Sequence, residues 1–128
     1  MCSSDLAFPR SASEISGEAV VALLDEARKN QAAGQFDMAA ANLQRALRIE
    51  PRNYFLWSAL ASVYLDQHQY DQAQTIALKS NSLAHGNLYV ELKNWQTIAA
   101  ARQANGDNAG ALQAHGKIDE IQRQLPSG

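Results

Sequence analysis

Residues 57–73 read WSALASVYLDQHQYDQA, and the framework of this stretch recurs both before and after it in the chain. The equivalents of Trp57, Ala61 and Ala73 stand 34 positions earlier and 38 positions later: Leu23, Ala27, Ala39, Trp95, Ala99 and Ala111. Repeats of this length are typical of stacked helical hairpins, in which each unit is too small to bury its apolar face alone. The sequence therefore predicts an all-α protein of three helix-turn-helix units.

Apolar spacing and turn residues place two helices in each unit. Val20, Leu24 and Ala27 share one face of the first helix, and Ser16 suits its start because a hydroxyl can accept from the free amides there. Pro51 ends the second helix. The helices expected are 17–34, 37–50, 54–67, 70–84, 88–105 and 108–124. They give a domain over 17–125 with repeats of about 20–53, 54–87 and 88–125.

Two departures from the regular repeat carry structural predictions. His68 occupies the turn position that is Gly34 in the first unit and Gly106 in the third, so it is expected to adopt positive φ. The spacing also lengthens by four residues before Trp95. About one added turn at the start of the fifth helix accommodates them.

Composition narrows the classes of partner. The chain has 128 residues and a formal net charge of −2, with basic and acidic residues mixed along it. It thus lacks the single-sign field that attracts nucleic acid, and nucleic acid is not an expected partner. It also has no run of about 18 apolar residues that would span a bilayer.

The beginning of the chain suggests an attachment to a membrane. Residues 1–16 are rich in serine, and Cys2 is the single cysteine. This segment is expected to be a flexible tether, reaching at most about 55 Å. A cysteine next to the first methionine and followed by serines resembles a mature bacterial lipoprotein, with lipid on Cys2; the alternative is a cytosolic start with a chance cysteine.

The middle repeat resembles the tetratricopeptide repeat family. The matching positions are Trp57, Leu60, Ala61, Tyr64, Tyr70 and Ala73, with Pro51 closing the first repeat, and the resemblance covers about residues 20–125. It implies three repeats in a short right-handed superhelix whose concave side binds a protein.

Residues that could support catalysis or bind a metal do not come together in the pattern. His68, His85 and His115 fall on a turn, a helix end and a helix, with no metal-ligand spacing between them. The chain also lacks a phosphate-binding glycine loop and a Gly-x-Ser-x-Gly nucleophile motif. We therefore expect no enzyme, no cofactor and no metal site.

The resemblance implies two candidate binding surfaces. The first helix of each repeat would line a concave groove with Leu24, Arg28, Phe55, Ser58, Ser62, Asp66, Lys93, Gln96 and Thr97. The second surface combines the added turn with the open end of the stack, where no capping helix follows: Leu88, Tyr89, Ile118, Ile121 and Leu125. The last three either stay partly exposed, as a site for a partner or for self-association, or pack back on the fifth helix. A monomer or a weak dimer is expected.

Together, the lipoprotein-like start and the repeats resemble the small tetratricopeptide repeat lipoproteins of the Gram-negative outer membrane. That resemblance implies a non-enzymatic activator of a bifunctional class A penicillin-binding protein, anchored on the periplasmic face of the outer membrane. The alternative is a general peptide-binding adaptor or scaffold of an envelope, pilus or secretion complex, with a cytoplasmic location also open.

Overall fold

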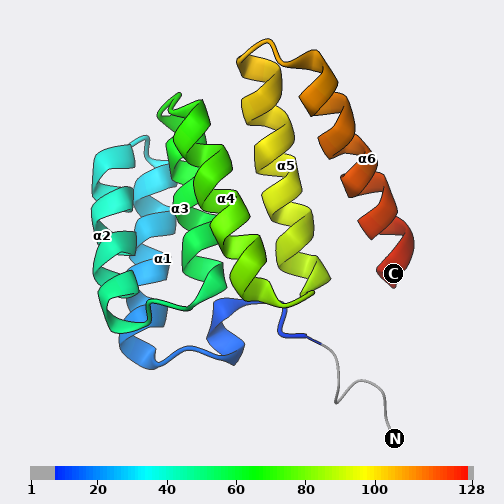
Figure 1. Ribbon diagram of the computed structural model, residues 1–128. Coiled ribbons are helices and arrows are strands. Elements are labelled where there is room, and N and C mark those ends of the chain that lie inside the picture. The colour runs from blue at the N-terminus through cyan, green and yellow to red at the C-terminus, as the bar shows by residue number, and fades with distance from the viewer. Residues whose placement is uncertain (1–7, 127–128) are drawn as a thin grey trace, which may run out of the picture.

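The computed structural model describes residues 8–126, which form six α-helices after a short 3-10 helix (Figure 1). The elements are η2 (Ala12–Glu14), α1 (Glu18–Ala32), α2 (Phe36–Ile49), α3 (Tyr54–Asp66), α4 (Tyr70–Ala84), α5 (Leu88–Ala104) and α6 (Asn108–Gln124). Helices neighbouring in sequence pack as three hairpins in a row. This confirms the all-α repeat architecture. In the described part of the chain no strand occurs, and no helix has the length and apolarity needed to cross a membrane.

The three inter-helix turns within the hairpins share one backbone conformation. Gly34, His68 and Gly106 have φ of 77°, 62° and 78°. The prediction of positive φ at His68 is therefore confirmed, and its ring stacks on Tyr70 at 5.8 Å between centroids. His85 at the end of α4 also has positive φ, 51°, which the sequence pattern did not indicate.

Two asparagines 34 positions apart begin the first helices of repeats two and three. The side chain of Asn53 accepts from the Phe55 amide at 3.0 Å, and that of Asn87 accepts from the Tyr89 amide at 3.1 Å. From these matched starts α3 runs for 13 residues and α5 for 17. The four extra residues therefore lengthen α5 by about one turn, as predicted.

The start of α1 differs from the expectation. Gly17, not Ser16, is the N-cap residue, and its amide donates to Glu50 Oε2 at 3.1 Å. The Ser16 hydroxyl instead accepts from Asn53 Nδ2 at 2.7 Å, so it is bonded across to the second repeat rather than to its own helix.

Apolar residues form two clusters of unequal size. The larger one joins the first two repeats, extends to Val90 of α5, and is built around fully buried leucines such as Leu24, Leu43 and Leu56. The smaller one lies farther along the stack and comprises Ala61, Ala77, Ile98, Ala99 and Ala114. The alanines that recur at equivalent positions of the three repeats are all buried: Ala27, Ala39, Ala61, Ala73, Ala99 and Ala111.

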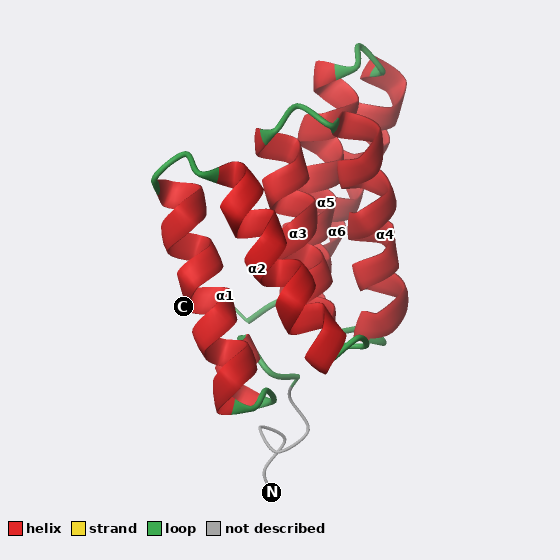
Figure 2. Ribbon diagram, turned by 90° about the vertical axis from the view of Figure 1, so that its left-hand side faces the viewer, coloured by secondary structure: helices red, strands yellow, loops and turns green. Residues whose placement is uncertain are grey.

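Residues 8–16, here called the N-terminal strap, pack beneath the stack and reach the loop between α4 and α5 (Figure 2). Asn87 Nδ2 donates to the Pro9 carbonyl at 2.9 Å, and Ala12 is buried in the larger cluster. The expectation of a flexible tether is therefore wrong for this part, because hydrogen bonds and apolar burial hold it in place. Cys2 and the rest of the expected tether lie outside the described residues.

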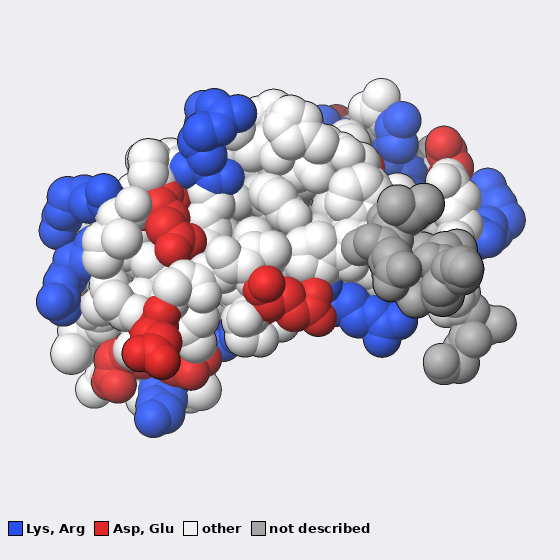
Figure 3. All heavy atoms as spheres, turned by 90° about the horizontal axis from the view of Figure 1, so that it is seen from below, with Lys and Arg blue, Asp and Glu red and all other residues white. Residues whose placement is uncertain are grey.

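The underside of the stack carries charges of both signs (Figure 3). Uncharged residues occupy much of the middle of this view, with Lys and Arg interleaved with Asp and Glu around them. No broad field of one sign faces the solvent here, in keeping with the small net charge of −2.

Candidate functional site

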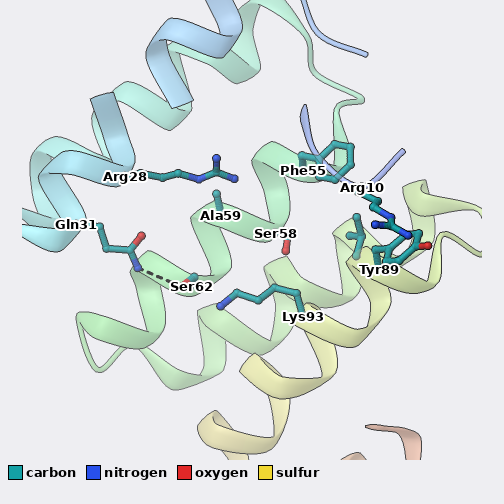
Figure 4. A pocket seen from close by; sticks show the side chains of 10 residues that line it. Arg10, Arg28, Gln31, Phe55, Ser58, Ala59, Ser62, Tyr89 and Lys93 are labelled. Carbon is teal, nitrogen blue, oxygen red and sulfur yellow. Dashed lines mark hydrogen bonds between the residues drawn. The ribbon is translucent and has the colours of Figure 1, made fainter. Parts of the chain in front are cut away.

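A cavity of about 290 Å³ lies on the side of the stack formed by the first helices of the three repeats. Helix α3 provides its floor, α1 and α5 its walls, and the N-terminal strap one end (Figure 4). We call it the groove. Its lining residues are Arg10, Arg28, Gln31, Phe55, Ser58, Ala59, Ser62, Tyr89, Val90 and Lys93.

The floor of the groove is set by the packing of α3. Phe55 and Ser58 are buried, whereas Ala59 and Ser62 are half-buried. Gln31 on α1 reaches across and donates through Nε2 to the Ser62 hydroxyl at 3.1 Å. The floor is therefore preformed, with small and polar side chains that leave room for a ligand.

Three cationic side chains border the groove, each from a different element. Arg28 comes from α1 and Lys93 from α5, and both side chains extend over α3 from opposite walls (Figure 4). The guanidinium carbon of Arg10 lies 5.0 Å from the centroid of the Tyr89 ring, a cation–π contact. None of the ten lining residues is acidic. The groove is thus an electropositive site on a weakly acidic protein.

The predicted groove residues divide into two sets. Five of the nine line the cavity: Arg28, Phe55, Ser58, Ser62 and Lys93. Asp66 and Gln96 are exposed but lie outside the lining, and Asp66 accepts from Gln31 Nε2 at 2.8 Å. Leu24 and Thr97 are buried at 1% and 3% exposure, so their assignment to the groove surface is wrong. The orientation of α1 and α5 about their own axes directs both side chains into the packed interior.

Sequence analysis missed four lining residues. Gln31 follows Arg28 by three positions, so helical spacing could have found it. Ala59 and Val90 could also have been placed by periodicity. Arg10 precedes the repeats, and no repeat pattern could indicate that the strap would carry it to α5.

The residues of the second candidate surface do not lie together in the structure. Leu88 and Ile121 line a cavity of about 680 Å³ between α4 and α6, but Tyr89 faces the groove. Ile118 packs against the smaller cluster and Leu125 is half-buried. Ile121 is only 5% exposed, which agrees with the alternative that it packs back on the stack. Leu112 is the large exposed apolar residue of α6, at 74%.

One carboxyl group on the wall of the cavity between α4 and α6 is electrostatically perturbed. Burial raises the pKa of Glu91 above its ordinary value, and the positive charge of Lys117 opposes that change. Across residues 8–126 no group of three or more His, Cys, Asp or Glu side chains is arranged to hold a metal ion.

Comparison with known families and sequences identifies the repeat. Residues 30–95, about half of the chain, match the tetratricopeptide repeat family. A 74-residue segment is 34% identical to the human superkiller complex protein 3; it makes up 58% of this chain but only 4% of that protein.

Two solved structures resemble the whole stack. The globular C-terminal domain of LpoP from P. aeruginosa is 38% identical, with a TM-score of 0.78 over 81% of this chain and 98% of that domain. The first tetratricopeptide repeat domain of Spaghetti (RPAP3), bound to the HSP90 peptide SRMEEVD, is 20% identical, with a TM-score of 0.61 over 88% and 100%. The second likeness concerns the fold alone.

Proposed function

Since this chain belongs to the tetratricopeptide repeat family, we propose that it is a protein-binding module that activates a bifunctional class A penicillin-binding protein. The observation that carries this proposal is the likeness to the LpoP domain, which extends over almost all of that domain at a substantial identity. The module is non-enzymatic: it acts by binding the synthase and favouring its active conformation.

The shape and the lining of the groove favour a protein partner over a small molecule. It is open on one side, its floor has small side chains, and its walls come from three different helices and the strap. A surface of this kind accommodates a chain segment laid across several repeats, which is how repeat stacks make extended concave binding sites.

We place the protein at the periplasmic face of the outer membrane through lipid on Cys2. The strap shortens the reach of such an anchor, because the chain is fixed to Asn87 from Pro9 onward. Six residues, 3–8, then separate the lipidated cysteine from Pro9, and the chain from Cys2 to Pro9 spans at most about 25 Å. The partner must therefore approach the membrane to meet the groove.

The decisive experiment measures glycan polymerisation by a purified class A synthase from the same bacterium, with and without this protein. We expect faster polymerisation and a detectable complex. Ala59→Gln, which fills the groove floor, should abolish the stimulation, whereas Leu78→Ser, which alters the cavity between α4 and α6, should preserve it. No rate change together with no complex would refute activation.

The anchor is tested separately by metabolic palmitate labelling of the full-length gene product, with Cys2→Ser as the control. We expect label on the wild-type protein and none on the variant. An unlabelled wild-type protein that also fails to stimulate the synthase would favour the alternative, a general peptide-binding adaptor of an envelope, pilus or secretion complex.

A further inference from the structure

The cavity between α4 and α6 lies on the face of the stack that the second helices of the repeats form, away from the groove. Both helices pack on α5 rather than on each other, and α5 lies between them (Figure 1). The cavity has a volume of about 680 Å³ and extends along α5 from Leu88 to Trp95, seven positions that span about 10 Å of helix. These dimensions fit two turns of a further helix laid between α4 and α6.

Large apolar side chains line this cavity from two helices. Leu78 on α4 is 44% exposed, and Leu88 and Trp95 on α5 are half-buried. All three line the cavity. Apolar side chains gathered on an exposed face mark a surface that another molecule covers.

The cavity also carries more negative than positive charge. Glu91 follows Leu88 by three positions and precedes Trp95 by four, so the three side chains share one face of α5. Burial raises the pKa of Glu91, and the charge of Lys117 opposes that change. Glu120 is the second carboxylate of the lining, and Lys117 is its one cation. A cation supplied by a partner would offset the desolvation of Glu91 and balance the charge.

The polar side chains that α4 contributes to the lining are already bonded within the protein. The Ser82 hydroxyl donates to the Lys79 carbonyl at 2.8 Å. Asn81 Oδ1 accepts from Asn94 Nδ2, also at 2.8 Å. An extended segment would find few partners here for its backbone amides and carbonyls, whereas a helix satisfies those groups internally. The lining therefore favours a helical occupant, held by its side chains.

We propose that the cavity between α4 and α6 binds an amphipathic helix of a second partner, whose apolar face covers Leu78, Leu88 and Trp95 and whose lysine or arginine pairs with Glu91. The first turn of α5, the one added in the third repeat, supplies both Leu88 and Glu91. The added turn is thus part of a binding site. This surface is separate from the groove, so the inference does not depend on activation of the synthase.

The probe is a fluorescein-labelled, alanine-rich peptide of about 18 residues, a length at which such sequences become helical. Leucines at positions i and i+7 and a lysine at i+4 form one face, and the control peptide has glutamine in place of the lysine. Fluorescence anisotropy at low salt should show the lysine peptide binding about fivefold more tightly, because only its cation can pair with a carboxylate. Equal binding of the two peptides, or no binding of either, would overturn the proposal.

A Glu91→Gln variant tests the assigned pair directly. It should bind the two peptides equally, because the carboxylate that distinguishes them is gone. Glu26→Gln, at an exposed position of α1 outside the cavity, is the matched control and should keep the preference. The change at Glu91 removes a charge that burial disfavours, so it does not compromise folding. A preference for the lysine peptide that survives Glu91→Gln would contradict the pair.

Removal of the cation in the lining should act in the opposite direction. Lys117→Gln is expected to tighten the lysine peptide about twofold, because the lysine then meets no like charge in the cavity. Lys29→Gln, an exposed lysine of α1 outside the cavity, should leave the affinity unchanged. A gain in affinity cannot result from misfolding. Weaker binding by the Lys117 variant would overturn the assigned electrostatics.

The apolar contact is tested with two exposed leucines. Leu78→Ser should weaken both peptides about threefold or more. Leu112→Ser, at a site of α6 that is 74% exposed and outside the lining, should weaken neither. Circular dichroism checks that both variants are folded. Equal losses in the two variants would show that the peptides do not use this cavity.

Sedimentation velocity of the protein alone examines the competing occupant, a second copy of this chain. We expect a monomer whose sedimentation coefficient does not change with concentration or with Leu78→Ser. A dimer that Leu78→Ser disrupts would assign this face to self-association and overturn the proposal of a second partner. Stimulation of the synthase is a separate readout, because a failure of peptide binding would refute this inference and leave activation standing.

Discussion

The first two repeats and the third are packed differently. The larger cluster joins α1, α2 and α3 with leucines, valines and Phe55 and extends to Ala84 of α4 and Val90 of α5. The smaller cluster, which reaches α6, has Ile98 as its single large buried side chain among alanines. Each buried leucine contributes about 1.5–3 kcal/mol relative to an exposed one, and an alanine much less. The third repeat is therefore the weaker unit of the stack.

In the third repeat, buried polar side chains replace part of the apolar core that the first two repeats have. Asn94 on α5 is fully buried and donates from Nδ2 to the Ser80 hydroxyl and to Asn81 Oδ1, both at 2.8 Å. The Ser80 hydroxyl donates in turn to the Tyr54 carbonyl at 2.8 Å. Hydrogen bonds fix one geometry more strictly than apolar contacts do, so these bonds position α5 against α4, although Asn94 Oδ1 is buried without a partner. The comparison teaches that the third repeat owes its place to specific bonds rather than to a large core.

The largest effect is expected from truncating a leucine in the larger cluster. Leu56→Ala, at a position with 0% exposure in the larger cluster, should lower the free energy of unfolding by about 2–5 kcal/mol because it leaves a cavity. Urea denaturation measures it. Leu112→Ala at an exposed site of α6 is the control and should change stability by less than about 0.5 kcal/mol. A loss of similar size in both variants would contradict the assigned core.

The same kind of truncation in the third repeat should act locally. Ile98→Ala removes the large side chain of the smaller cluster, so amide hydrogen exchange is expected to speed up in α5 and α6 while α1 and α2 stay protected. Uniformly faster exchange along the chain would show that the two clusters unfold as one unit.

The next effect tests the polar contacts. Ser80→Ala leaves a buried amide hydrogen of Asn94 and the Tyr54 carbonyl without this partner and should cost about 1–3 kcal/mol. Ser82→Ala is a matched control, since that exposed hydroxyl donates only to the Lys79 carbonyl within α4. Equal stability of the Ser80 variant and the wild type would mean that Asn94 and Ser80 do not hold the third repeat.

Two glycines in α6 should respond in opposite directions. A Cβ at Gly110 would collide with the Asp107 side chain, which caps α6 by accepting from the Gly110 amide at 2.9 Å, so Gly110→Ala should destabilise by about 1 kcal/mol. Nothing lies within 4 Å of a Cβ at Gly116, and Gly116→Ala should stabilise by about 0.5–1 kcal/mol. Thermal melts of both variants check the signs, and a change of the same sign in both would be inconsistent with this structure.

The smallest effect concerns pH. Burial raises the pKa of Glu91 above its unfolded value, so its contribution to stability is fully present below the unfolded pKa and is lost as pH rises through the folded one. Glu91→Gln should therefore be more stable than the wild type at neutral pH, with the difference vanishing below about pH 4. Glu120→Gln on the same cavity is the control. Urea midpoints across pH measure the difference, and a gap that widens toward low pH would reverse the assignment.

The fold was largely predictable because its signals are local. The helix spans, the turn at His68 and the added turn of α5 all follow from spacing and from the conformational preferences of glycine, proline and asparagine. The family resemblance was less successful for the groove. It placed Leu24 and Thr97 on the surface although both face the interior, since a position on the concave helix does not fix the exact rotation of that helix.

The sequence by itself determined three helical hairpins, their boundaries and the small residues at their crossings, because these depend on contacts within about 40 positions of the chain. Only the tertiary structure decided that the strap docks, that Arg10 joins Arg28 and Lys93, and that polar bonds hold the third repeat. The bond from Asn87 to the Pro9 carbonyl joins residues 78 positions apart. No repeat period encodes such a contact, because one partner lies outside the repeats.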